Sequence, residues 1–504
     1  DMEELTHVER AVEEFKTGNS LAVSKLEHRL SGDDDEDVIL LLDELNRVCV
    51  GDWYEDVALE RIVNHVLGLG FERIARSKWL CEVYTKLLLN LASSNAAFVE
   101  PCLLVLCRGM QLGDDVECVR HGVLRGVAHI LDQHPAALRP FAGMLTKNFP
   151  HHRNPVEKIC AYSSFLLVLS EQTTSRFLRE HIIGLEVERI AVVDAEAASI
   201  SGEIDQQLTE KLDSMLALFL DFMRKSAESQ RRTNNELFRI IYGAFERTVL
   251  PTYRLSAAPF ILFFSCACAP EFFEEVDDHL RTIFFDSAVP TSTRSAALQH
   301  SAALAGHLSL VSVSQVLVWQ RQISGFLHRY LDSCDPASQV VDVDVHNPFY
   351  SAFGCLMTTI VTRRNSLATY PDGDEQLRQL RLARLVRSSL NPLKLMPAEY
   401  ASEFCAVLCQ CGVADVTDVL IQNEGLVIPT KTKWGNRNSI ELVLPLAHFK
   451  WELEQCGRFV NPYWVDERAP TMNGDPVAKG SRDGGWEGTI EFATSVREPV
   501  GVAP

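Results

Sequence analysis

The feature that most constrains this sequence is the run Phe260–Cys268 (FILFFSCAC), which is apolar around its whole circumference when read as a helix. A helix that is apolar on every side must be covered on every side. The run ends before Pro270 and is too short to cross a bilayer. It therefore predicts a helix buried in the interior of a helical protein.

An amphipathic helix precedes this run. Phe238, Ile241, Tyr242 and Phe245 recur at steps of three and four residues, which places them on one helix face. The pattern stops at Val249-Leu250-Pro251-Thr252, before the apolar run begins. An amphipathic helix, a break marked by proline and a buried helix together indicate stacked helix pairs.

The same alternation of helices and short breaks continues through the chain, and no convincing β-hairpin pattern interrupts it. The sequence therefore predicts an all-α fold, a HEAT-repeat-like α-solenoid of antiparallel helix pairs. A solenoid grows by adding repeats, so a chain of 504 residues can form one domain. Helices expected outside the central stretch include Lys78–Ala92, Ala96–Met110, Val116–Gln133, Ala136–Asn148, Val156–Ser170, Thr173–Ile190, Leu208–Arg224, Phe272–Phe285, Thr291–His307, Val311–Leu331, Phe349–Arg363, Asp374–Leu390 and Pro397–Cys411.

The expected domain organisation is simple. Residues 1–466 form a single helical-repeat (HEAT-like) domain, in which residues 1–37 have the weakest pattern. A polar stretch near residues 194–207 predicts a loop within that domain. Residues 467–504 are rich in Gly, Pro and small polar residues and predict a disordered C-terminal tail.

The net charge of −20 and the isoelectric point of about 5.2 argue against strong direct binding to nucleic-acid phosphates, which needs a basic excess. An acidic chain favours basic protein partners instead. The first residues contain no apolar signal core, and cysteines are scattered through apolar helical patterns, as in a reducing compartment. We expect an intracellular protein that does not bind membranes.

Motifs of the common enzyme classes are not found. The sequence holds no GxxxxGK[ST] phosphate loop, HExxH, GxSxG or kinase catalytic loop. The nearest approach to a metal cluster is Cys405, Cys409 and Cys411, which lacks a second paired motif and is better explained by core packing. We predict a protein that is not an enzyme, with no catalytic residues, cofactor or metal.

Basic and titratable groups crowd the linker between the helices predicted at 136–148 and 156–170, in an otherwise acidic chain. One interpretation is a solvated loop whose prolines fix the turn. The other is a docking surface in which a phosphate, with its charge of about −1.5 to −2, disrupts an interface by repulsion and desolvation. We call this candidate surface the docking edge, and its residues are Lys147, His151, His152, Arg153, Lys158, Ser163, Ser164 and Ser170.

Several short segments occur in the order seen in one protein family, the RNA polymerase I-specific transcription initiation factors. The resemblance covers about residues 38–466. No single segment is diagnostic, but together and in register they indicate the family. The segments are Asn148–Pro150 (NFP), Leu212–Arg224 (LDSMLALFLDFMR), Phe245–Thr252 (FERTVLPT), Phe260–Cys268, Asn347–Ala352 (NPFYSA), Leu390–Lys394 (LNPLK) and Arg458–Trp464 (RFVNPYW).

The resemblance implies a non-enzymatic HEAT-repeat protein of the nucleus and nucleolus. Such a protein bridges RNA polymerase I to the promoter-bound core or selectivity factor at ribosomal RNA genes. In the family a serine-rich patch in the N-terminal half contacts the polymerase and is tuned by phosphorylation, which makes Ser163, Ser164 and Ser170 candidates here. The resemblance also implies a possible homodimer.

Two other classes of protein fit parts of the same sequence. A HEAT-type nuclear transport receptor or trafficking adaptor would share the acidity, the helix pairs and the intracellular cysteines. An enzyme with an unrecognised site would require a pocket where titratable groups converge. The ordered segments favour the initiation factor, since a generic solenoid has no reason to carry NPFYSA and LNPLK at these positions.

Overall fold

The structure is a computed structural model of the whole chain. It describes residues 5–49, 56–112, 117–199, 206–229, 234–252, 255–334, 341–343, 345–426, 431–432, 435–436 and 453–468. One compact unit comprises Asp1–Glu467. Most of the predicted C-terminal tail thus lies outside the described residues.

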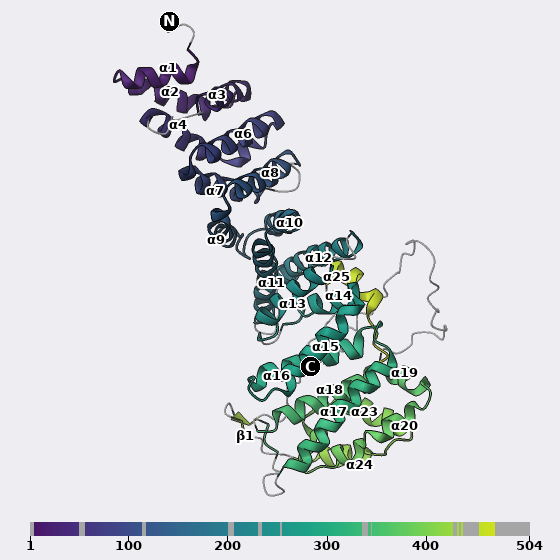
Figure 1. Cartoon of the computed structure of the whole chain (residues 1–504). Helices are drawn as coiled ribbons and strands as arrows, with labels where there is room; N and C mark the ends of the chain where they lie inside the picture. The colour runs from purple at the N-terminus through teal and green to yellow at the C-terminus, as the bar shows by residue number, and fades with distance from the viewer. Residues whose placement is uncertain are drawn as a thin grey trace, which may run out of the picture. The chain divides into compact units, whose positions relative to one another are not determined.

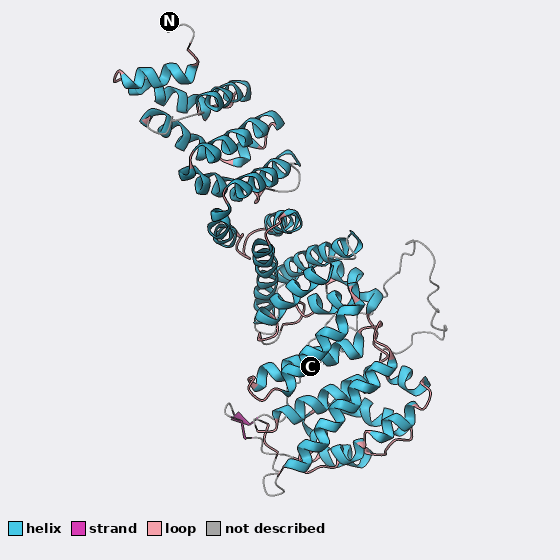
Figure 2. Cartoon of the chain, in the orientation of Figure 1, coloured by secondary structure: helices cyan, strands magenta, loops and turns pink. Residues whose placement is uncertain are grey.

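Helices dominate the described part of the chain (Figure 2). In the first third, helices follow one another in chain order and each packs on elements close to it in sequence (Figure 1). They are α1 (His7–Lys16), α2 (Ser20–Leu30), α3 (Asp35–Val48), α4 (Val57–Leu67), α5 (Phe71–Ile74), α6 (Lys78–Ser94), α7 (Val99–Gly109), α8 (Glu117–Gln133) and α9 (Leu138–Asn148), with 3-10 turns η2 (Ala96–Phe98) and η3 (Pro135–Ala137).

The longer helices and the last elements follow. They are α10 (Val156–Gln172), α11 (Arg176–Ser199), α12 (Gln206–Ser229), α13 (Asn234–Thr248), α14 (Phe260–Cys268), α15 (Pro270–Phe285), α16 (Thr291–His307), α17 (Val313–Ser333), α18 (Asn347–Thr362), α19 (Arg364–Thr369), α20 (Gly373–Gln379), α21 (Leu382–Val386), α22 (Pro392–Leu395), α23 (Ala398–Gln410), α24 (Thr417–Glu424), the two-residue strands β1 (Lys431–Thr432) and β2 (Gly435–Asn436), α25 (Glu454–Val460) and the 3-10 turn η5 (Asn461–Tyr463).

Helices alternate between two rows. In the N-terminal part α6 packs on α3 and α8, while α7 packs on α9. Further on, α16 packs on α15 and α18, and α18 also contacts α17 and α23. Packing of each helix on near neighbours in the chain is the arrangement of an α-solenoid. The predicted all-α fold of HEAT-like helix pairs is confirmed.

The apolar run forms α14, and every residue from Phe260 to Ala267 is buried. Helices α12, α13 and α15 cover it, and the much later α25 closes the remaining side. In Figure 1 the yellow α25 lies beside the teal α12 and α14, although it is far from both in sequence. The expectation that this helix must be covered on every side is confirmed.

The predicted polar loop near residues 194–207 is wrong at its start. Helix α11 continues to Ser199, residues 200–205 lie outside the described residues, and α12 begins at Gln206. The reason is Asp194, which is fully buried on α11. Its carboxylate accepts hydrogen bonds from the backbone N–H groups of Ser256, Ala257 and Ala258 at 2.8–3.1 Å, just ahead of α14. Asp194, which lies in a segment of loop-like composition, therefore helps to position the central buried helix α14.

The single helix predicted over Asp374–Leu390 is also wrong. The chain forms the short helices α20 and α21, which are separated at Arg381 by a left-handed backbone conformation with φ of 49°. This conformation is costly for a residue with a side chain, and it ends α20. Nothing in the local residue pattern signals such a break.

Candidate docking surface

The docking edge lies between α9 and α10, where the chain leaves one helix and turns into the next. Asn148 Nδ2 donates to the Met144 carbonyl at 2.8 Å and helps to close the end of α9. Phe149 is buried and packs edge-on against Tyr162 at 5.3 Å between ring centroids. The Tyr162 hydroxyl donates to the Leu145 carbonyl at 2.9 Å. These contacts hold the linker to the helices at both of its ends.

The polar residues of the linker reach forward to later helices. His151 and His152 lie ring against ring at 3.8 Å, and His152 Nε2 lies 3.0 Å from a Glu196 carboxylate oxygen on α11. Lys211 on α12 donates through Nζ to the His152 carbonyl at 3.0 Å. Burial lowers the pKa of His152, and the neighbouring His151, Arg153 and Lys211 lower it further, whereas Glu196 raises it. His151 and Arg153 are exposed to solvent.

Two of the predicted serines do not lie on a surface. Ser163 and Ser170 are 2% and 1% exposed, and the Ser170 hydroxyl donates to the Leu167 carbonyl at 2.6 Å. Helix α10 is covered by α8, α11 and α12, which leaves little of its surface open. Their placement on an exposed docking edge is therefore wrong, because neighbouring helices cover this side of α10 and a serine such as Ser170 can satisfy its hydroxyl inside the helix.

Ser164 is the predicted serine that remains partly accessible. Arg120 on α8 donates through Nη2 to its hydroxyl at 2.9 Å, and the same guanidinium lies over the Phe165 ring at 5.5 Å. Lys147 is exposed, and Lys158 is half-buried. Among the predicted residues, the basic side chains and the Ser164 hydroxyl are thus at least partly accessible.

A hollow of about 600 Å³ adjoins the docking edge. Pro155, Glu157 and Lys158 line it from the start of α10, together with the turn between α4 and α5 and one face of α7. Its lining combines apolar side chains with charges of both signs. The residues contributed by the other elements are Leu67, Gly68, Leu69, Gly70, Phe71, Glu72, Val105, Arg108, Gln111 and Leu112.

Sequence reasoning found only the part of this hollow that belongs to the linker. Arg108 lies on α7 and Gln111 lies just after its end, both far from the linker in sequence. Gln111 Nε2 donates to the Asn148 carbonyl at 2.8 Å. Glu72 belongs to the short helix α5. No local pattern identifies these residues, since only the packing of α7 beside the linker brings them to it.

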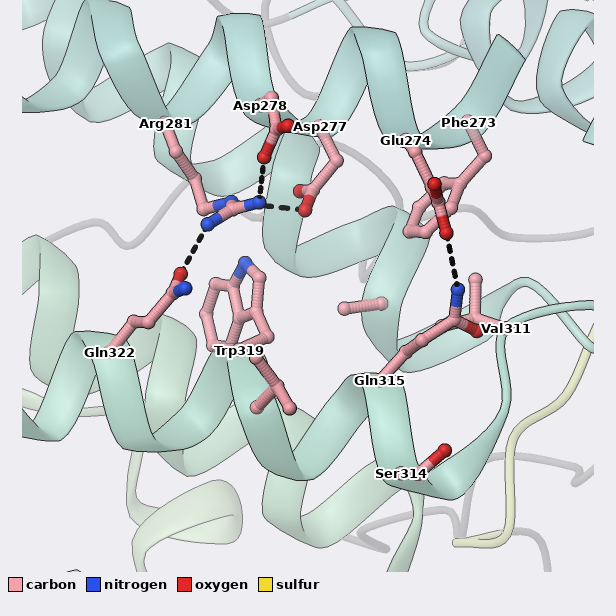
Figure 3. Close-up of a pocket in the computed structure, with 12 residues that line it drawn as sticks. Phe273, Glu274, Asp277, Asp278, Arg281, Val311, Ser314, Gln315, Trp319 and Gln322 are labelled. Atoms are coloured by element: carbon pink, nitrogen blue, oxygen red, sulfur yellow. Dashed lines mark hydrogen bonds and ion pairs between the residues drawn. The ribbon is translucent and has the colours of Figure 1, made fainter. Parts of the chain in front are cut away.

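A second hollow, of about 260 Å³, lies between α15 and α17 and is shown in Figure 3. The Arg281 guanidinium contacts Asp277 at 3.0 Å and also Asp278 and Gln322. Gln315 Nε2 donates to a Glu274 carboxylate oxygen at 3.3 Å. Arg281 and Glu274 on α15 bind Gln322 and Gln315 on α17 across the hollow. We therefore interpret these polar groups as contacts that hold the two helices together.

The described residues offer no group of three or more His, Cys, Asp or Glu side chains arranged to hold a metal ion. Cys405 and Cys411 are buried, and Cys409 on the same helix is exposed. In the described part of the chain no helix has the length and apolarity needed to cross a membrane. The fold is that of a helical-repeat protein.

A family model for "RNA polymerase I specific transcription initiation factor RRN3" matches residues 2–208 and 198–442, and the chain belongs to this family. The family is one of transcription initiation factors and not of enzymes. The resemblance seen in the sequence is confirmed.

Relatives of this chain occur in several organisms. The RNA polymerase I-specific transcription initiation factor RRN3 of Mus musculus is 23% identical over 558 aligned positions, which cover 96% of this chain and 82% of the mouse protein. The rrn3 factor of Schizosaccharomyces pombe is 21% identical, over an alignment that covers 43% of this chain and 38% of the yeast protein. The tif-1A factor of Caenorhabditis elegans is 22% identical, over an alignment that covers 40% of this chain and 36% of the nematode protein.

A solved structure shares the fold. The crystal structure of RNA polymerase I transcription initiation factor Rrn3 superposes with a TM-score of 0.73 at 20% identity, and the match covers 83% of this chain and 88% of that chain. The helical-repeat architecture is therefore common to both proteins.

Proposed function

We propose that this chain acts as an RNA polymerase I transcription initiation factor in the nucleus and nucleolus. It bridges the polymerase to the promoter-bound core or selectivity factor at ribosomal RNA genes through protein–protein contacts. The observation that carries the proposal is the family match along residues 2–442. The transport receptor or trafficking adaptor has no comparable support.

The docking edge is our proposed contact with the polymerase, and Ser164 is its proposed regulatory position. His151 and Arg153 are exposed there, in a chain whose net charge is −20. A phosphate on Ser164 would place negative charge beside Arg120, whose guanidinium already reaches the hydroxyl. The net positive charge of this surface would then fall. Homodimerisation is a further proposal, which sedimentation of the purified chain tests.

Co-purification from nuclear extract tests the main proposal. The tagged full chain is expected to recover subunits of RNA polymerase I and of the core or selectivity factor. Recovery of transport factors or coat proteins alone would overturn the proposed function. A tagged helical-repeat protein of an unrelated family serves as the control for adhesion to a large acidic surface.

Charge reversal tests the docking edge in the same assay. Arg153→Glu with Lys158→Glu is expected to lower polymerase recovery about tenfold, the effect of roughly 1.4 kcal/mol in binding free energy. Ser164→Asp is expected to lower recovery in the same direction, and Ser164→Asn separates the charge from the change in shape. Arg329→Glu with Lys25→Glu carries an equal charge change on α17 and α2 and should leave recovery unchanged. Normal recovery by folded variants of the edge would reject this surface.

A further inference from the structure

A groove runs between α6 and α8, apart from the docking edge. The two helices pack closely because Gly122 and Gly126 on α8 have no side chains, and a Cβ atom at Gly122 would lie only 2.9 Å from Thr85 Oγ1. The side chains on either side of this close contact form the walls. They enclose an open hollow of about 850 Å³.

The groove has the length of a short peptide. Its lining residues on α6 extend from Lys78 to Ser93, which corresponds to about 22 Å along a helix. An extended chain rises about 3.3 Å per residue, so a segment of about seven residues would fill the groove. A peptide is therefore a better match in shape than a small molecule, for which the groove is too open and too long.

The groove is locally basic in a chain that carries 68 acidic and 48 basic residues. Glu82 is the carboxylate among its described lining residues, and Asp43 lies 4.0 Å from Lys86 Nζ on one rim. Within the described part of the chain, the cationic and imidazole groups other than Lys86 form no ion pair. The basic and imidazole residues that line the groove are Lys78, Lys86, His121, Arg125 and His129.

An exposed tryptophan stands at the edge of this groove. Trp79 is 70% exposed, and it precedes Lys86 by seven residues, so the two side chains lie on the same side of α6. Tryptophan exposed to this extent offers a partner a large apolar surface, and aromatic side chains are enriched where proteins bind one another. Cations along the groove and an apolar contact at its edge together describe the complement of an acidic segment with apolar residues.

We propose that the groove between α6 and α8 binds an acidic, partly apolar peptide segment of a partner protein. Carboxylates of the segment pair with Arg125 and Lys78, and an apolar side chain packs on Trp79. A nucleic-acid strand fits less well, because Glu82 lies in the groove and the permanent cations are few for a phosphate backbone. The inference goes beyond the proposed function, since it does not depend on which complex carries the segment.

Fluorescence anisotropy with the purified full chain tests the proposal. The probe is a short labelled peptide in which glutamates alternate with leucines, and it is compared with the same peptide carrying glutamines and with a uridine oligonucleotide. The glutamate peptide is expected to bind saturably and more weakly as salt rises. Arg125→Glu is expected to weaken binding about tenfold. Trp79→Ala is expected to weaken it about fivefold, in the range of an exposed aromatic contact.

Matched controls keep the outcomes distinct. Arg329→Glu makes the same charge change on the exposed face of α17 and should not alter binding. Absence of saturable binding, equal binding of the glutamine peptide, or an Arg125→Glu variant that is folded and binds normally would each overturn the proposal. Tighter binding of the oligonucleotide with the same dependence on Arg125 would overturn it in favour of a nucleic-acid site. No polymerase is present in this assay, so its result stands apart from co-purification.

Discussion

Glu186 on α11 is a carboxylic acid that is 2% exposed to water. Burial raises its pKa to about 8 from the ordinary 4.5, while the Ser163 hydroxyl and Arg189 partly oppose the shift. As pH rises, the Glu186 carboxyl therefore ionises at a lower pH in the unfolded chain than in the folded chain. Between about pH 4.5 and about pH 8 the folded state therefore binds more protons than the unfolded state, and stability falls as pH rises.

Glu186→Gln removes this titration. The variant is expected to lose less stability than the wild type as pH rises from about 5 to about 8, by up to roughly 1.4 kcal/mol for each pH unit. The urea midpoint measured across that range gives the comparison. Glu188→Gln, an exposed position on the same helix, should follow the wild-type curve. Parallel curves for wild type and Glu186→Gln would show that the carboxyl is ionised in the folded state throughout.

At the scale of residues, the sequence predicts only part of the candidate site. The basic linker is visible because its prolines and charges are consecutive. The burial of Ser163 and Ser170 is not, since it depends on α8, α11 and α12 covering α10. Arg108 joins the hollow beside the linker only through the packing of α7. Local composition does not contain that information.

Helices are the scale at which sequence reasoning works best here, because apolar periodicity marks the buried face of each one. It fails where a polar side chain serves a distant element. The composition around Asp194 predicts a loop, but its carboxylate binds the backbone ahead of α14. Asp213 on α12 acts in the same way, since its two carboxylate oxygens accept from Gln455 N and Cys456 N at 2.9 Å, at the start of α25.

Asp213→Ala is expected to loosen α25 because it removes both acceptors from the first turn of the helix. The expected cost is about 1–2 kcal/mol, as for the loss of a helix cap. Hydrogen exchange should accelerate over Glu454–Val460 and remain unchanged in α6 to α9. Ser214→Ala is the matched control, because it removes only an exposed bond to the Gln455 side chain. Unaltered exchange in α25 would show that apolar packing alone holds this helix.

At the scale of the molecule, the segment 461–467 connects helices that are far apart in the chain. Trp464 stacks on His307 at 4.0 Å and contacts the Phe263 ring at 5.5 Å. Val465 N donates to the His307 carbonyl at 2.8 Å. The Glu467 carboxylate accepts from the backbone of Asn365 at 2.6 Å and also from that of Ser366. One short segment thus contacts α14, α16 and α19.

Trp464→Ala is expected to destabilise the central and C-terminal helices together by about 2 kcal/mol, less than the cost of a fully buried tryptophan. Hydrogen exchange should accelerate in α14 and α16, whereas α1 to α9 should keep the wild-type rates, since a solenoid transmits stability mainly between neighbours. Trp79→Ala, at an exposed tryptophan on α6, provides the control. Uniform acceleration along the whole chain would contradict a local role for the segment.

The late cover of α14 also affects how the protein is made. Helix α14 ends at Cys268, and α25 begins only at Glu454. A ribosome adds about 5–20 residues per second, so the stretch between the two helices takes about 9–37 s to synthesise. During that interval α14, the most apolar of the described helices, lacks one of the helices that cover it. We therefore expect the nascent protein to expose apolar surface of the kind that chaperones bind until α25 has emerged.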